Sequence, residues 1–148
     1  MSTFHIDEIS AAQTFPLRSQ VLRNRDSGIP CPFDGDNDST THHFACFREN
    51  EIVAIASFYL RKSDLLGNAR MVQLRGMAVH PEFAGKGYGR ELMNYAFSFF
   101  KDKGIDLIWC NARESAFEFY RKLGFKSIGD NFEIPDIGVH KVMYITYL

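Results

Sequence analysis

The sequence predicts a mixed α/β (α+β) fold built as one domain over residues 1–148, because strand-like and helix-like patterns alternate along the chain. Three local patterns predict this fold class. They are an apolar strand that runs through a glycine-rich turn into a helix, a second strand followed by a helix, and two strands joined by a tight turn. These patterns occupy residues 71–102, residues 105–124 and residues 43–60.

The N-terminal part is expected to hold one strand, one helix and a long loop. Residues 4–9 are interpreted as the first strand. Leu17, Val21 and Leu22 then have helical spacing, and Pro16 is expected in the first turn of that helix, where a missing N–H is tolerated. Residues 24–41 are polar and irregular, and we expect a loop there.

The middle of the chain is expected to form three strands and a helix, at residues 43–48, 52–60, 71–79 and 87–102. Apolar side chains in the helix repeat at intervals of three and four residues, so one face is expected to be buried. That face comprises Tyr88, Leu92, Ala96 and Phe99.

The following strand, residues 105–110, leads into a second helix. Ser115 and Glu118 have the spacing of a capping box, which predicts that this helix opens at Ser115. One apolar stripe of the helix is expected to comprise Ala116, Phe119, Tyr120 and Leu123.

Composition favours one folded domain and excludes several partners. The chain has 148 residues, of which 45% are hydrophobic, and its formal charge of −1 provides no field for nucleic acid or an anionic membrane. No apolar run approaches the ~20 residues that span a bilayer, and the N-terminus lacks the pattern of a signal sequence. We therefore expect a cytoplasmic protein with no nucleic-acid or membrane partner.

Neither the cysteines nor the acidic loop predicts a metal site or a disulfide. Cys31, Cys46 and Cys110 lack CxxC spacing and are expected to be free thiols. The run DGDND resembles the start of an EF-hand loop, but its sixth and twelfth positions are Ser39 and Ala45 instead of glycine and glutamate. A solvated loop is the favoured interpretation. The alternative is that Asp36 and Asp38 cover an acceptor site and attract a cationic amine.

The glycine-rich turn has the local architecture of a phosphate-binding cradle. Gly85, Gly87 and Gly89 allow close approach of a ligand to the backbone, and the helix that follows offers unpaired amides and a positive dipole end. The dinucleotide pattern GxGxxG fails because Arg90 stands at its last position, and no Walker sequence occurs. A cradle of another type remains, with a purely structural turn as the alternative.

This segment, MAVHPEFAGKGYGRELM, resembles the acyl-CoA-binding motif of the GNAT superfamily of N-acetyltransferases, Q/R-x-x-G-x-G/A. The leading Gln or Arg is replaced by Ala84, which supplies backbone alone, and Lys86 and Arg90 are expected to supply the missing polarity. The residues aligned with the motif are Ala84, Gly85, Lys86, Gly87, Tyr88 and Gly89.

A second segment, LIWCNARESAFEFYRKLGF, resembles the superfamily pattern N…A…FYxxxGF. The resemblance implies that Asn111 and Tyr120 lie beside the pantetheine arm and the thiol, with Phe119 in the cofactor-binding set. The closing run GDNFEIPDIGVHKVMYI resembles the tail of an ElaA-like or YjcF-like bacterial branch. The implied architecture is a mostly antiparallel mixed central sheet flanked by helices, with a splay between the fourth and fifth strands.

The chemistry implied by this resemblance is direct transfer of an acetyl group from acetyl-CoA to an amine of a small-molecule or peptide acceptor. Developing charge on the thioester oxygen needs a fixed donor, which the family takes from a backbone amide of the strand, here Met77, Ala78 or Val79. Tyr120 is the candidate proton donor to the departing thiolate.

The general base has no clear candidate, because Gln73 and Arg75 stand where many superfamily members have a strand glutamate, and Glu82 lies past the strand. We expect a water relayed by a carboxylate of residues 34–38. His43 and His140, which is expected to precede the last strand, are further candidates on the substrate side.

Two further interpretations stay open. One is a non-catalytic domain that binds acyl-CoA as a sensor or recruits a partner, which the Ala84 departure favours. The other is a homodimer contact through Tyr144 and Tyr147, for which a core or edge-strand role is the alternative.

Overall fold

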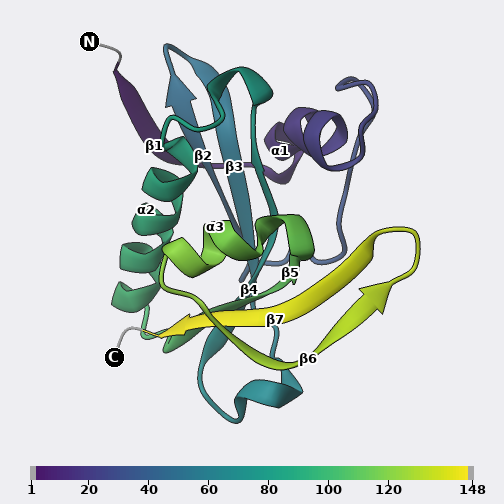
Figure 1. Cartoon of the computed structure of the whole chain (residues 1–148). Helices are drawn as coiled ribbons and strands as arrows, with labels where there is room; N and C mark the ends of the chain where they lie inside the picture. Colours follow the sequence, from purple (N-terminus) through teal and green to yellow (C-terminus); the bar gives the residue numbers. More distant parts are fainter. Residues whose placement is uncertain (1–2, 147–148) are drawn as a thin grey trace. The chain divides into compact units, whose positions relative to one another are not determined.

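The computed structural model describes residues 3–146, which form a mixed sheet and several helices (Figure 1). The strands are β1 (Phe4–Ile9), β2 (His42–Arg48), β3 (Glu51–Tyr59), β4 (Met71–Val79), β5 (Leu107–Arg113), β6 (Lys126–Ile134) and β7 (Gly138–Thr146). The α-helices are α1 (Ala11–Leu17), α2 (Tyr88–Asp102) and α3 (Phe117–Lys122). A π-helical turn, η1 (Arg18–Leu22), continues α1, and three 3-10 turns are η2 (Asp64–Leu66), η3 (Pro81–Phe83) and η4 (Glu114–Ala116).

The sheet has the strand order β1-β2-β3-β4-β5-β7-β6. The pairs β1–β2, β2–β3, β5–β7 and β6–β7 are antiparallel, whereas Met71–Gln73 of β4 pair in parallel with Leu107–Trp109 of β5. The predicted mixed, mostly antiparallel sheet is therefore confirmed. A splay of β4 from β5 beyond these residues stays a prediction.

The chain forms two compact units, Met1–Tyr59 with Arg75–Phe99, and Leu60–Leu74 with Phe100–Leu148. We refer to them as the first and second units. Strand β4 and helix α2 contribute residues to both. A single domain over residues 1–148 stays a prediction.

The core of the first unit lies on both faces of β2. Ala45 packs with Leu17, Ile55 and Ala78 in one buried cluster. Its neighbour Phe44 points to the opposite face, where its ring contacts those of Tyr95 and Phe99 in α2. The predicted buried face of α2 is confirmed, with Tyr88, Leu92 and Ala96 buried and Phe99 half-buried.

The core of the second unit forms around Met71, Leu107, Trp109 and Val142. Trp109 also donates a hydrogen bond from Nε1 to the carbonyl oxygen of Arg61, at 2.9 Å. Tyr144 is half-buried against this cluster, so the core alternative holds for it. Tyr147 lies outside the described residues, and a homodimer stays a prediction.

The first helix begins earlier than expected. Ser10 caps it by accepting a hydrogen bond from the Gln13 amide, while the Gln13 side chain accepts one from the Ser10 amide, which completes a capping box. Pro16 therefore lies inside α1, and its predicted place in the first turn is wrong. The chain continues as the π-helical η1, a local adjustment that accommodates the lost N–H.

The predicted opening of the second helix at Ser115 is also wrong. Residues 114–116 form the 3-10 turn η4, and α3 begins at Phe117 without a side-chain cap. The turn places Ser115 inside η4 instead of before a helix. Tyr120 is buried as expected, but Phe119 is 36% exposed, so the predicted apolar stripe is only partly buried.

No helix of residues 3–146 is long and apolar enough to cross a bilayer.

Candidate functional site

The glycine-rich turn leads directly from β4 into α2. Gly85 and Gly87 have φ angles of +75° and +87°, and a Cβ atom built at either position would meet no atom within 4 Å. Both residues are exposed, and the Glu91 amide bonds the Gly87 carbonyl as α2 begins. This backbone is therefore open to a ligand at the positive end of a 15-residue helix. Gly89 lies within α2 and is buried, so the turn itself depends on two of the three glycines.

Cationic side chains gather at this turn. Lys86 Nζ lies 5.7 Å from the ring centroid of Phe83, and Arg48 Cζ lies 5.5 Å from the same centroid. Lys86 and Arg90 are exposed, and their role of replacing the polarity lost at Ala84 stays a prediction. The open amides and these cations suit the diphosphate of an acyl-CoA.

Aromatic contacts anchor the turn to the first unit. Tyr88 is buried, and its ring meets those of Phe4 and Phe83 edge-on, with centroids 5.8 and 6.1 Å apart. Its side chain therefore holds the start of α2 in place. Only the backbone of Tyr88 is left for the role that the motif assigns to this position.

The residues expected to provide the oxyanion donor lie in the last part of β4. Met77 and Val79 are half-buried, and Ala78 is buried in the core. Gly76, just before them, has φ of +66°, which marks a local irregularity of the kind that β-bulges produce. The assignment of the donor to Met77, Ala78 or Val79 stays a prediction.

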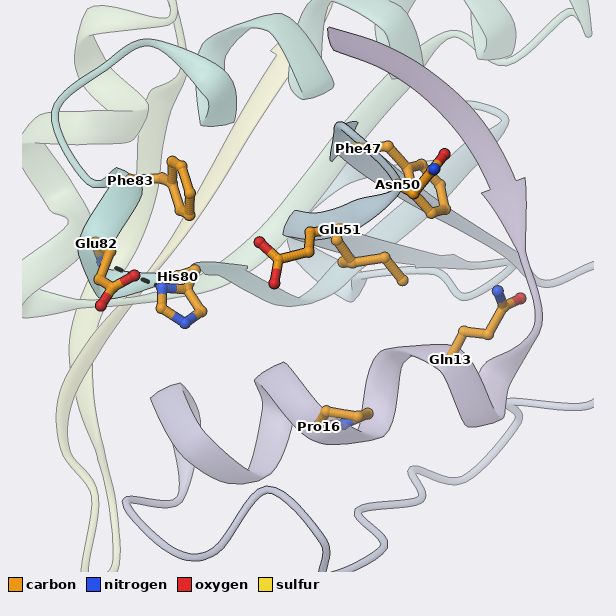
Figure 2. A pocket seen from close by; sticks show the side chains of 9 residues that line it. Gln13, Pro16, Phe47, Asn50, Glu51, His80, Glu82 and Phe83 are labelled. Atoms are coloured by element: carbon orange, nitrogen blue, oxygen red, sulfur yellow. Dashed lines mark hydrogen bonds between the residues drawn. The ribbon is translucent and has the colours of Figure 1, made fainter.

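A pocket of about 460 Å³ opens in the first unit next to the end of β4 (Figure 2). Glu51, at the start of β3, and Glu82, in η3, bring carboxylates to it, and Phe47 and Phe83 supply aromatic surface. The strand end is fixed there because the His80 amide donates to the Val53 carbonyl at 2.8 Å. The residues that line the pocket are Gln13, Pro16, Phe47, Asn50, Glu51, Ile52, His80, Glu82 and Phe83.

One hydrogen bond indicates the tautomer of a neutral His80. Its Nδ1 accepts from the Glu82 amide at 3.1 Å, so a neutral His80 carries its proton on Nε2 and acts there as a donor. Sequence reasoning missed both His80 and Glu51. His80 could have been found from the sequence, because it directly follows the strand that leads into the glycine-rich turn. Glu51 could not, because its place beside the pocket depends on how the strands are arranged.

A buried ion pair joins η1 to the loop before β2 in the first unit. Arg18, fully buried, donates from Nη1 to Asp36 Oδ2 at 2.8 Å and from Nη2 to Asp36 Oδ1 at 3.0 Å. Asp36 also accepts hydrogen bonds from the Phe33 amide and the Tyr59 hydroxyl, at 2.8 and 2.6 Å. Burial opposes its ionisation, but the bonds from Arg18, Phe33 and Tyr59 outweigh it and lower the pKa of Asp36 to about 2.

His43, Ser57 and Tyr59 surround this ion pair and form a buried cluster with it. The hydrogen bonds of the cluster fix the tautomer of His43. His43 Nε2 lies 2.9 Å from the Asp36 carbonyl oxygen and must donate to it, so Nδ1 accepts from the Ser57 hydroxyl at 2.7 Å. Burial lowers the pKa of His43, although the bond to Asp36 acts in the opposite direction. Burial and the bond to Asp36 raise the pKa of Tyr59 to about 12. At neutral pH the cluster therefore contains a single ion pair and neutral partners.

This arrangement changes the interpretation of the acidic loop. The prediction of a solvated loop is wrong at Asp36, which is buried, although Asp34 and Asp38 are exposed as expected. The Asp36 carboxylate is committed to Arg18 and so has little capacity to attract a cationic amine. Arg18 was missed because its helical position gave no sign of a partner 18 residues away.

The second unit holds the other residues of the predicted site. Asn111 is exposed and Tyr120 is buried. Strand β5 extends to Arg113, which places Asn111 in the strand and not after it. Burial raises the pKa of Tyr120 well above 10, with a smaller contribution from Cys110, so its hydroxyl keeps its proton. His140 lies within β7, not before it, and its Nδ1 donates to the Gly138 carbonyl at 2.8 Å.

The cysteines are free thiols, as predicted, and all three are buried. Burial raises the pKa of Cys110, and burial with the Glu91 carboxylate raises that of Cys46 to about 11, so neither is a thiolate at neutral pH. Within residues 3–146, no group of three or more His, Cys, Asp or Glu side chains is arranged to hold a metal ion.

Comparison with known proteins agrees with this geometry. The model of the Acetyltransferase (GNAT) family matches residues 7–125. The chain is 34% identical over 141 residues to the uncharacterized N-acetyltransferase YitI of Bacillus subtilis, and the alignment covers 95% of each chain.

Solved structures share the fold. Escherichia coli ElaA superposes with a TM-score of 0.70 at 21% identity, covering 97% of this chain and 99% of that one. An aminoglycoside 6'-N-acetyltransferase complexed with coenzyme A gives 0.72 at 15% identity, covering 97% of each chain. The predicted resemblance is confirmed: the chain belongs to the GNAT family of acetyltransferases.

Proposed function

We propose that this protein transfers an acetyl group from acetyl-CoA to an amine of a small molecule or a peptide. The observation that carries the proposal is the turn at Gly85 and Gly87, whose open backbone leads into the N-terminus of α2. The reaction forms a bond between the acceptor nitrogen and the acetyl carbon and breaks the carbon–sulfur bond. One proton leaves the nitrogen, and one reaches the sulfur.

The residues of the chain divide these tasks. The backbone of residues 84–90, with Lys86 and Arg90, is assigned to the diphosphate. A backbone amide of Met77, Ala78 or Val79 is assigned to the carbonyl oxygen. Asn111 and Phe119 are assigned to the pantetheine arm. Tyr120 is the proposed donor to the leaving sulfur, and its raised pKa keeps the hydroxyl protonated, which supports a hydrogen bond to the departing thiolate.

The base is assigned to a carboxylate with access to solvent. Asp36 accepts four hydrogen bonds and its pKa is about 2, which makes it a poor base. Glu51 and Glu82 face the pocket next to β4, and Asp38 is exposed on the loop. The single replacements Glu51→Gln, Glu82→Gln and Asp38→Asn distinguish these three candidates. Loss of the true base should remove the acidic limb of the pH profile of kcat/KM.

A second candidate function is binding of acyl-CoA without transfer. It is favoured by Ala84 in place of the Gln or Arg of the motif and by Gln73 and Arg75 in place of a strand glutamate. Such a sensor needs the phosphate cradle but not a protonated Tyr120.

Two measurements on the purified protein decide between these functions. Calorimetry with acetyl-CoA tests binding, and release of free thiol in the presence of an amine library tests transfer. Binding with amine-dependent thiol release supports the enzyme. Binding without release from any amine supports the sensor, and absence of binding contradicts both.

A further inference from the structure

We infer that the acceptor amine carries a second cationic group, and that Glu51 and Glu82 bind its two nitrogens in the pocket beside His80 (Figure 2). This inference rests on the proposed function and names the class of its acceptor. One carboxylate faces the reacting nitrogen, and the other binds the second positive charge. Small diamines, and larger amines with a second ammonium or guanidinium group a few bonds away, belong to this class.

The pocket offers negative charge without an internal partner. Glu51 and Glu82 supply carboxylates to it, and His80 is the single side chain among the described lining residues that can become cationic. Neither glutamate carboxylate forms a hydrogen bond or an ion pair within residues 3–146. Asp36, in contrast, is committed to Arg18. A cleft lined by charge of one sign concentrates ligands of the opposite sign, so this pocket favours cations.

Two cations lie near the pocket, but neither pairs with its carboxylates. Arg48 Cζ and Lys86 Nζ lie 5.5 and 5.7 Å from the ring centroid of Phe83. Neither cation lines the pocket, and in the described part of the chain neither forms an ion pair. The proposed function assigns Lys86 to the diphosphate, whose charge then balances it. The carboxylates of the pocket therefore remain available to a cationic ligand.

The rest of the lining suits the hydrocarbon part of such an amine. Phe47, Ile52 and Phe83 are half-buried and line the pocket. The Phe47 ring stacks on that of His5 with centroids 4.9 Å apart and packs against the core cluster of the first unit, so it is held in place before a ligand arrives. Aromatic rings pack against methylene groups and attract cations. The volume of about 460 Å³ lies in the range of small-molecule sites.

The pocket lies at the end of the strand that is assigned to the thioester. His80 directly follows Val79, the last of the proposed donors to the carbonyl oxygen, and one strand residue advances about 3.3 Å. The His80 amide donates to the Val53 carbonyl, and His80 Nδ1 accepts from the Glu82 amide, so the strand end and η3 are fixed. Figure 2 shows the Glu51 carboxylate turned toward His80 and η3. A nitrogen bound there is thus close to the predicted reaction point.

The test compares three amines of equal chain length as acceptors, using acetyl-CoA and thiol release. 1,4-Diaminobutane has the second ammonium group, 1-aminobutane lacks it, and 4-aminobutanoate has a carboxylate in its place. We expect kcat/KM, corrected for the two equivalent nitrogens of the diamine, to favour the diamine over the monoamine by about tenfold or more. 4-Aminobutanoate should be the poorest acceptor.

Binding is measured separately, because Glu51 and Glu82 are also candidates for the base. Amide resonances of the protein saturated with coenzyme A provide Kd values for the diamine and the monoamine. Glu51→Gln and Glu82→Gln should each reduce the binding preference for the diamine by about threefold or more, as expected for an exposed ion pair. Glu49→Gln is the matched control, since Glu49 is exposed in the same β2–β3 turn but does not line the pocket, and it should leave the preference unchanged.

Equal kcat/KM values for the diamine and the monoamine, or a preference for 4-aminobutanoate, would overturn the inference and leave the proposed acetyl transfer intact. An equal loss of binding preference in Glu49→Gln would also overturn it, because the attraction would then come from the general field of the turn. The same holds for a diamine that binds tightly but is acetylated no faster than the monoamine. Absence of thiol release with every amine would overturn the proposed transfer as well, so the two failures are distinguishable.

Discussion

The carboxylate of Asp36 accepts two hydrogen bonds from the guanidinium of Arg18, at 2.8 and 3.0 Å, and both side chains are buried. This pair joins the end of the first helical segment to the loop before β2. Bringing two charges out of water is costly, and only mutual pairing with further hydrogen bonds offsets that cost. Loss of either partner leaves the other charged and buried.

Asp36→Ala should therefore lower the free energy of unfolding by about 3–5 kcal/mol. Urea denaturation followed by circular dichroism measures this difference. Asp38→Ala is the matched control, since it removes an exposed aspartate from the same loop and should change stability by no more than about 0.5 kcal/mol. Equal effects of the two replacements would show that the ion pair contributes little.

Stability should also fall in acid, in two windows. The folded pKa of His43 lies below its ordinary value of about 6.5, so the unfolded chain takes up the proton first and stability declines as pH drops below that value. The pKa of Asp36 is lowered from 3.8 to about 2, so its contribution is present above 3.8 and is lost between these values. His43→Gln should remove the first decline and keep the second in urea titrations across this range. A decline that persists unchanged in this variant would assign it to other groups.

Alanine at Gly85 or Gly87 should weaken acetyl-CoA binding by about tenfold or more, which corresponds to about 1.4 kcal/mol. The added Cβ meets no protein atom within 4 Å, and it stands where the phosphates are proposed to approach. Calorimetric Kd values provide the measurement. Gly67→Ala is the control, because Gly67 has φ of +70° and equally open surroundings in another loop. The three variants should lose similar stability, and only the first two should lose affinity. Equal affinities in all three would exclude the turn as the phosphate site.

Tyr120→Phe should lower kcat by about a hundredfold and leave the Kd for acetyl-CoA nearly unchanged. Burial keeps the hydroxyl protonated, and the replacement removes that proton with little change in packing. Tyr144→Phe, which removes a hydroxyl from a half-buried tyrosine of the same unit, should have no such effect. Full activity in the Tyr120 variant would transfer the donor role to another group or to water.

Local patterns were sufficient for much of the fold. The bounds of β1 and β4 match their predicted ranges, and α2 begins within one residue of its expected start. Helix α2 carries strong apolar periodicity, and glycines mark the turn between β4 and α2. The conformation of the glycine turn was also predictable, because it depends on the residues of the turn itself.

Features that depend on distant partners were not predictable. Nothing in the local sequence marks Arg18 as buried, and only the folded loop shows that Asp36 neutralises it. Ser115 and Glu118 had capping spacing, but the preceding strand continues to Arg113 and leaves only a 3-10 turn before α3. The pocket beside His80 combines residues from α1, the β2–β3 turn and η3, whose proximity requires the sheet register.

The most direct measurement is a titration of the ¹⁵N-labelled protein with acetyl-CoA, followed by amide resonances. At 17.0 kDa the chain is well suited to this experiment. The account predicts that the largest shifts occur at the backbone amides of residues 85–90, with Gly85 and Gly87 among them. Saturable binding that leaves these resonances in place and moves amides elsewhere would contradict the claim that this turn holds the diphosphate.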